Sequence, residues 1–105
     1  MSKTLKVAEI SELKSGECKT VEVDGQTLAL FNVDGTFYAI DNTCSHVGGP
    51  LGEGALAGNE VTCPLHGAQF DVTCGKALSG PARGDVKSFP VSLEGDDVLV
   101  ELEGN

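Results

Sequence analysis

Apolar and polar residues alternate with a period of two in parts of the first forty positions, loosely over Leu5–Ile10 and clearly over Cys18–Val23, whereas Thr27–Val33 is rich in apolar residues. Both patterns are typical of β-strands. Asp24-Gly25 and Asp34-Gly35 interrupt this alternation, and such pairs are strong signals for two-residue hairpin turns. Because parallel strands would need long crossover connections, the short spacing predicts an antiparallel sheet. Its strands are expected over Leu5–Ile10, Cys18–Val23, Thr27–Val33 and Thr36–Ile40.

The middle of the chain is rich in glycine and is predicted to be mainly loop. Gly48–Gly58 contains five glycines and a proline, and Ser79–Gly84 is expected to be a second long loop. Short strands are expected between them, over Glu60–Cys63 and Gln69–Val72. The chain then closes with a hairpin joined by residues 94–97, whose strands are Val86–Leu93 and Val98–Leu102.

These elements predict an all-β fold. The chain has 105 residues, enough for one small domain and too few for two independent cores. We therefore expect residues 1–105 to form a single domain with an antiparallel β-sandwich or barrel as its base. A small metal-carrying subdomain, covering approximately residues 42–82, is expected to be inserted in that base.

Two short sequences in this middle region combine cysteine with histidine. They are Cys44-Ser45-His46 and Cys63-Pro64-Leu65-His66, and they include both histidines of the chain. Thiolates and imidazoles are soft to borderline ligands that suit zinc, copper or iron–sulfur clusters. Ordinary core packing explains the pairing poorly, so the residues predict a metal site. A Cys₂His₂ zinc site and a 2Fe–2S centre with two histidine ligands both remain open at this point.

The two pairs resemble the two cluster-binding boxes of the Rieske iron–sulfur family. The resemblance covers nearly the whole chain, and it implies the β base domain and the inserted cluster subdomain of that family. Within the family, this short chain is similar to the Rieske-type ferredoxins that serve bacterial oxygenases. Beyond the boxes, the resemblance continues in Phe70-Asp71, in Thr73-Cys74-Gly75-Lys76 and in a proline loop, Gly80-Pro81-Ala82.

The resemblance implies one Rieske 2Fe–2S cluster with four protein ligands. Cys44 and Cys63 would bind one iron through sulfur. His46 and His66 would bind the other iron through a ring nitrogen. These ligands would leave no open position for a substrate, so we expect an electron carrier and not an enzyme. Apolar residues near the boxes are expected to keep water from the cluster, namely Val47, Pro50, Leu51, Leu65 and Pro81. Four of them, Val47, Pro50, Leu65 and Pro81, are also expected to form the centre of a docking patch.

Departures from the high-potential branch of the family predict a low reduction potential. That branch has an extra cysteine in each box, joined as a disulfide, where this chain has Gly49 and Leu65. It also has a serine and a tyrosine that donate hydrogen bonds to cluster sulfurs, where this chain has Ala68 and Phe70. Fewer donors stabilise the reduced cluster less and lower its potential.

The chain is acidic, with a formal net charge of -9 from 16 acidic and 7 basic residues. Such a surface repels nucleic acid and anionic membranes and attracts basic partners. Between Cys44 and Arg83 there are three acids and two bases, so this region is nearly neutral and the rest carries the negative charge. No apolar run could span a bilayer and the first residues lack the apolar core of a signal peptide, so we expect a cytoplasmic protein.

Cys18 and Cys74 do not stand at ligand positions of either box. We expect each to be a small buried hydrophobe, and a disulfide between them would be disfavoured in a reducing cytosol.

The resemblance also implies the partners. The chain would accept one electron from a reductase, expected to contain flavin, and pass it to a terminal oxygenase. We expect a monomer with no nucleic-acid or membrane partner. Two alternatives remain: a small Rieske-like subunit of a larger reductase such as nitrite reductase, and a structural zinc module.

Overall fold

The computed structural model describes residues 2–42, 50–64, 67–79 and 84–103, and these form short antiparallel strands and two single 3-10 turns. The elements are β1 Ser2–Glu9, η1 Ile10–Glu12, β2 Cys18–Val23, β3 Gln26–Val33, β4 Thr36–Asp41, η2 Leu51–Glu53, β5 Ala55–Ala57, β6 Glu60–Thr62, β7 Gln69–Asp71, β8 Ala77–Ser79, β9 Ser88–Phe89, β10 Val91–Glu94 and β11 Asp97–Glu103.

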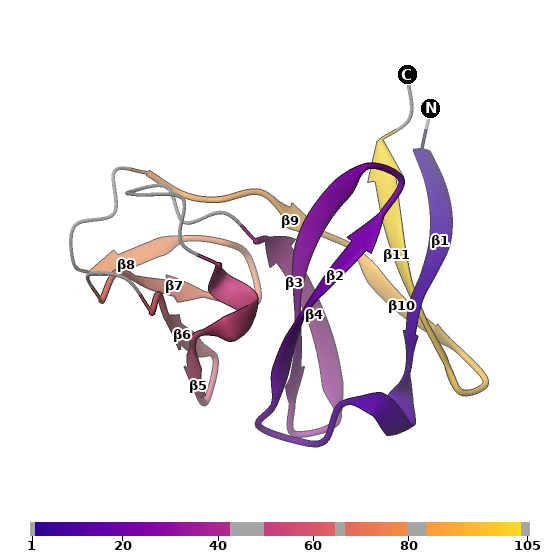
Figure 1. Cartoon of the computed structure of the whole chain (residues 1–105), viewed down its shortest axis with the longest axis horizontal. Helices are drawn as coiled ribbons and strands as arrows, with labels where there is room; N and C mark the ends of the chain where they lie inside the picture. The colour runs from indigo at the N-terminus through magenta and orange to yellow at the C-terminus, as the bar shows by residue number, and fades with distance from the viewer. Residues whose placement is uncertain (1, 43–49, 65–66, 80–83, 104–105) are drawn as a thin grey trace.

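The strands make three antiparallel sheets. Their orders are β1-β11-β10, β2-β3-β4-β9 and β5-β6-β7-β8. The first two sheets form the base of the molecule, and the β5–β8 sheet lies beside them in Figure 1. Because the chain enters the β5–β8 sheet after β4 and returns to the base in β9, this sheet is an insertion. The predicted all-β fold with an inserted subdomain is confirmed, whereas the boundaries 42–82 stay a prediction.

Both predicted Asp-Gly hairpins are present. Asp24 and Gly25 have φ angles of 51° and 78°, and Asp34 and Gly35 have 55° and 92°. Two consecutive residues with positive φ match the right-handed twist of the flanking strands, which is why this turn class is preferred in tight hairpins. These turns fix the register of β2, β3 and β4, so that Val23 pairs with Gln26 across the first turn.

Strand β3 is buried on both faces and separates two hydrophobic cores. Because side chains alternate across a strand, Leu28 and Leu30 pack into the core between the two base sheets. Ala29 and Phe31 point the other way, into a second core shared with the inserted sheet. The nearly continuous apolar run of β3 follows from this double burial. The second core is the one that holds Cys63.

The predictions of two loops were wrong in part. The region Gly48–Gly58 contains the 3-10 turn η2 and the strand β5, and Ser79 belongs to a strand β8 that was not predicted. Both strands have three residues and exist because they pair with β6 and β7, respectively. Their short sequences carry no local strand pattern.

The closing hairpin also differs from the prediction. The expected strand Val86–Leu93 is divided at Pro90, which has no N–H to donate to a ladder. The chain uses the break to change sheets, since β9 pairs with β4 whereas β10 pairs with β11. At the tip, Glu94 and Asp97 pair with each other, so the turn is two residues long and not four.

Candidate metal centre

Cys63 is the predicted ligand that lies within the described residues. Its side chain is 2% exposed, directly after β6, in the core between the base and the inserted sheet. Cys44, His46 and His66 lie outside the described residues, as do Val47, Gly49, Leu65 and Pro81. The four-residue ligand set therefore remains a prediction, and the surroundings of Cys63 are the part that can be tested against it.

A closed turn holds the backbone of Cys63. Its N–H donates to the carbonyl oxygen of Ala68 at 2.7 Å, which joins the end of β6 to the start of β7. Within this turn Gly67 has a φ of 74°, in the left-handed region that favours glycine. The ladder of β6 and β7 continues directly from the turn, with Thr62 paired to Gln69. The position of Cys63 is thus fixed by the two strands that flank the second box.

The walls around Cys63 are apolar. Leu51, Ala68 and Phe70 belong to the same core cluster, and each is 0% exposed. A buried thiolate is unfavourable in such surroundings unless a positive ion compensates its charge. A buried cysteine at the start of a closed turn fits a metal–sulfur centre, in which the metal would compensate the charge of the thiolate. Pro50, also expected near the cluster, is partly exposed.

Asn42 is a buried polar residue that the sequence reasoning missed. It directly follows β4 and is 8% exposed. Its backbone oxygen accepts a hydrogen bond from Leu51 N–H at 2.7 Å, and its side-chain Oδ1 accepts one from Gly52 N–H at 2.8 Å. These bonds join the two ends of the segment that contains the first box. An asparagine at the end of an apolar strand, two residues before a cysteine, is the available sequence signal.

Three further hydrogen bonds lie where the chain leaves the inserted sheet and returns to the base. Gly75, with a φ of 81°, donates its N–H to Asp71 O at 2.7 Å and accepts from Val86 N–H at 2.8 Å. Asp85 accepts a hydrogen bond from Ala77 N–H at 2.8 Å. Residues on both sides of the predicted proline loop are thus joined to each other.

Cys18 and Cys74 are free thiols and are not joined to each other. Cys18 is partly buried, donates to Gly54 O at 3.3 Å, and has a raised pKa, mainly because of burial and secondly because of Glu17. The thiol therefore stays protonated, consistent with a packing role. Cys74 is exposed, so the expectation that it is buried was wrong.

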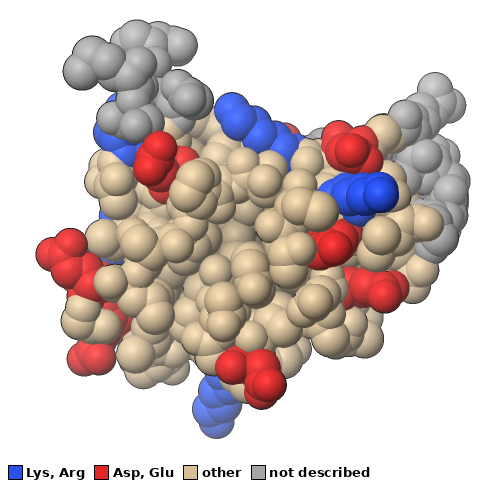
Figure 2. All heavy atoms as spheres, turned by 180° about the vertical axis from the view of Figure 1, so that it is seen from behind, with Lys and Arg blue, Asp and Glu red and all other residues tan. Residues whose placement is uncertain are grey.

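The ion pairs formed by the described residues lie in the base. Lys3 pairs with Asp24 at 2.7 Å, and Lys19 with Glu12 at 2.9 Å. Lys6 contacts Asp97 and Glu9, and these contacts raise its pKa, that with Asp97 more than that with Glu9. Figure 2 shows a face with a broad uncharged middle and charged side chains mainly toward its edges.

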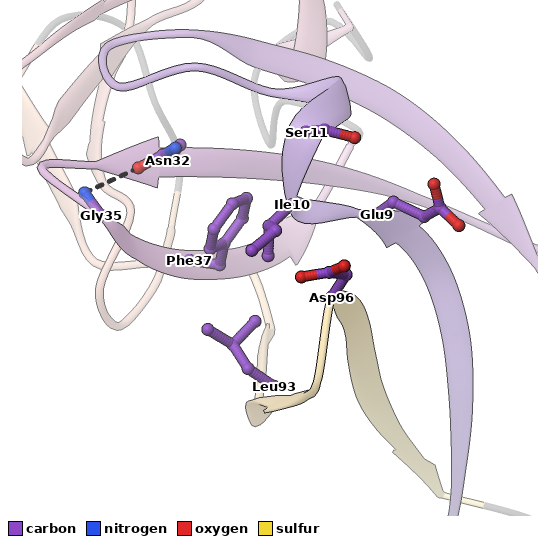
Figure 3. Close-up of a pocket in the computed structure, with 8 residues that line it drawn as sticks. All are labelled: Glu9, Ile10, Ser11, Asn32, Gly35, Phe37, Leu93 and Asp96. Carbon is purple, nitrogen blue, oxygen red and sulfur yellow. Dashed lines mark hydrogen bonds between the residues drawn. The ribbon is translucent and has the colours of Figure 1, made fainter.

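A groove of about 520 Å³ lies on the base, at η1 and the β10–β11 hairpin, on the side away from the β5–β8 sheet (Figures 1 and 3). It has no cysteine or histidine, so it offers no soft ligand and is separate from the candidate metal centre. Its lining residues are Glu9, Ile10, Ser11, Asn32, Gly35, Phe37, Leu93 and Asp96.

Comparison with known proteins decides between the two kinds of metal site left open by the residues alone. The Rieske [2Fe-2S] domain family matches residues 3–90. The chain belongs to the Rieske [2Fe-2S] domain family. Its cofactor is therefore a Rieske-type 2Fe–2S cluster, and the structural zinc site is not favoured.

Two further comparisons place the chain within this family. It is 39% identical over 100 residues to the ferredoxin component of the naphthalene 1,2-dioxygenase system of Pseudomonas aeruginosa, covering 95% of this chain and 96% of that protein. It also matches a chain in a solved complex of reduced oxygenase and oxidized ferredoxin in carbazole 1,9a-dioxygenase, at 35% identity and a TM-score of 0.87. That match covers 92% of this chain and 91% of the other.

A third likeness concerns the nitrite reductase alternative. A solved structure described as a candidate NADPH nitrite reductase small subunit has a TM-score of 0.79, with 93% of this chain and 97% of that one covered. Its sequence identity is 21%, so this likeness shows the shared fold alone. The ferredoxin relatives share more sequence over a similar length.

Proposed function

We propose that this chain is a one-electron carrier whose Rieske cluster is held by Cys44, His46, Cys63 and His66. It takes electrons from a reductase and passes them to a terminal oxygenase. The observation that carries the ligand assignment is the burial of Cys63, at the start of a turn closed by its bond to Ala68, in a chain that belongs to the Rieske family.

The chain's own residues supply a dry and fixed environment for such a centre. When bound, a Rieske cluster supplies the reversible uptake of one electron. Leu51, Ala68 and Phe70 share a buried core with Cys63 and would help to keep water from its sulfur. The turn that joins Cys63 to Ala68 fixes the backbone of the thiolate ligand, so little rearrangement is needed when the charge of the site changes.

The partners follow from the relatives. The naphthalene relative is a ferredoxin component of a dioxygenase system, and the carbazole structure is a complex of an oxygenase with a ferredoxin. By analogy, the acceptor of this chain is a terminal oxygenase, and its donor is a flavin-containing reductase. The protein is not itself an enzyme, because the four proposed ligands leave no coordination position for a substrate. We also propose that it acts as a monomer.

Among the residues that the structure describes, no helix has the length and apolar character needed to cross a membrane. The cytoplasm is the compartment we propose, because it holds the reductants that such a carrier would need.

A reconstituted electron-transfer assay tests this function. The protein, reduced with dithionite and freed of excess reductant, is mixed in a stopped-flow instrument with the oxidised oxygenase that it serves. We expect the visible absorption of the oxidised cluster to return as the oxygenase is reduced. Stable co-elution with a reductase in gel filtration, together with no reoxidation by any oxygenase, would instead support the permanent-subunit alternative.

A further inference from the structure

Asn42 makes a set of contacts that the proposed electron-transfer role does not by itself explain. A buried amide must satisfy its hydrogen-bonding groups, and Asn42 is 8% exposed. Its Oδ1 accepts from Gly52 N–H at 2.8 Å and from Thr20 Oγ1 at 3.2 Å. One side chain therefore connects three parts of the chain: the end of β4, the edge strand β2 and the turn η2.

The backbone of Asn42 makes the same connection. Its carbonyl oxygen accepts from Leu51 N–H at 2.7 Å, and its N–H donates to Thr27 O at 3.3 Å. Bonds from position 42 to positions 51 and 52 thereby join the two ends that flank residues 43–50 in the sequence. Cys44 and His46 stand in the sequence between these closed ends.

Gly52 shows independently that this close approach is built into the chain. A Cβ atom at position 52 would overlap Thr20 Oγ1 and would lie 2.8 Å from Thr20 N and 2.9 Å from Asn42 Oδ1. Real Cβ atoms essentially never approach other atoms so closely. The backbone can therefore reach the amide only because position 52 has no side chain.

We propose that Asn42 is a positioning residue for the cluster, acting through Gly52 to fix the spacing between the two ends of the segment that carries Cys44 and His46. The inference rests on the proposed ligand set. Fixing the ends of a short segment restricts the conformations available to the residues within it. Hydrogen bonds behind a metal ligand hold it in the orientation that the metal requires, and their loss changes both affinity and electronic properties.

The test compares Asn42→Ala with Asn32→Ala in the cluster-loaded protein. Asn32 is a matched control because it is the other buried asparagine of the described residues, at 7% exposure. It also makes two side-chain hydrogen bonds, donating to Leu13 O and accepting from Gly35 N–H, both at 2.8 Å. Figure 3 shows the bond to Gly35 at the groove on the base, whose lining includes no residue of the inserted sheet. The two variants therefore remove equivalent bonds at different places.

Two readouts separate positioning from general stability. They are the EPR spectrum of the reduced cluster and the rate at which an iron chelator removes iron from the folded protein. We expect Asn42→Ala to shift the g-values and to speed iron loss about tenfold. Asn32→Ala should leave the EPR spectrum and the iron-loss rate unchanged, although both variants unfold at lower denaturant concentration. Equal behaviour of the two variants in both readouts would overturn the proposal.

A second pair of variants decides the case if Asn42→Ala fails to fold or to bind a cluster. Thr20→Val removes one of the two donors to Asn42, whereas Thr20→Ser keeps it. We expect Thr20→Val to change the EPR spectrum in the same direction and Thr20→Ser to restore the native spectrum. If both variants give the native spectrum, the proposal is wrong. The unmodified protein is measured first, so absence of a Rieske spectrum there would reveal failure of the ligand set itself.

Discussion

Cys63 is placed by bonds of its own backbone and by the apolar residues around it. The turn from Cys63 ends at Ala68, directly before β7, and Ala68 is also buried. Ala68 and Phe70 occupy positions at which the high-potential branch carries hydroxyl groups, and both are 0% exposed here. Neither side chain offers a hydrogen-bond donor, so we expect the cluster to have a low reduction potential.

We predict that Ala68→Ser raises the reduction potential. The native value should lie near the low end of the Rieske range, on the order of −150 mV, and a hydroxyl beside the Cys63 turn would stabilise the reduced state. The exposed Ala57, on β5, gives the control variant Ala57→Ser, which should leave the potential unchanged. The reduction potentials of the native protein and both variants are measured by redox titration monitored by circular dichroism. A potential of Ala68→Ser at or below the native value would contradict this explanation.

Asp71 stabilises the turn that follows β7, and this contribution should depend on pH. Thr73 donates to Asp71 Oδ1 through its hydroxyl at 2.6 Å and its N–H at 2.9 Å, and these bonds lower the pKa of Asp71 below its ordinary value of 3.8. A carboxyl whose pKa is lower in the folded state stabilises the protein above its unfolded pKa. This stabilisation is lost as the pH falls through the folded value.

We therefore predict that Thr73→Val lowers stability at pH 7 by roughly 1 kcal/mol relative to Thr73→Ser, which keeps the hydroxyl. The difference should shrink as the pH falls below 3.8, the ordinary aspartate pKa. Denaturant unfolding of both variants across this range measures it. A difference that is constant with pH would show that the hydroxyl acts by packing and not through the carboxylate.

At the scale of elements, the meander of β2, β3 and β4 could be predicted because its signals are local. Alternation in β2 and the apolar run of β3 indicate strands, and the two Asp-Gly pairs give the turns. The strands β5 and β8 could not be predicted, since each depends on a partner strand for its structure. The contacts of Asn42 could not be predicted for the same reason, because Thr20 and Gly52 are distant from it in sequence. The ligand pairs were visible because they are short and chemically unusual.

Gly75 connects the inserted sheet to the returning chain, and we predict that Gly75→Ala is strongly destabilising. A Cβ there would overlap Val86 O, and the φ of 81° is already unfavourable for alanine. The control is Gly58→Ala, with a φ of 62° and no atom within 4 Å of the added Cβ. It should lose only the left-handed strain of about 1–2 kcal/mol. Gly75→Ala should lower the free energy of unfolding in urea by about 3 kcal/mol or more. Equal losses in the two variants would contradict the proposed clash with Val86 O.

At the scale of the whole molecule, charge and apolar exposure are distributed unequally. Thirteen of the 16 acids lie outside residues 44–83, so the inserted region is nearly neutral. The exposed large hydrophobic residues of the described chain are Leu78, at 42%, and Leu93, at 50%. Leu78 is on β8 of the inserted sheet, whereas Leu93 is on β10 beside the groove in Figure 3.

We predict that Leu78→Asp slows electron delivery to the oxygenase and that Leu93→Asp does not. Electron transfer needs the cluster side of the carrier to face its partner, and such contacts are small, below about 1,200 Å². One introduced charge should therefore lower the association rate several-fold when it falls within the contact. Stopped-flow rates at several oxygenase concentrations measure the effect. The reverse order of the two variants would place docking on the base.

The central claim is that His46 and His66 both bind the cluster, and pulsed EPR of the reduced protein tests it most directly. The chain has two histidines, so protein labelled with ¹⁵N only in histidine reports on these two residues and no others. We predict strong hyperfine couplings to two histidine nitrogens, as expected when both imidazoles bind one iron of a 2Fe–2S centre. Coupling to one nitrogen, or to none, in protein containing about two irons per chain would contradict the ligand set.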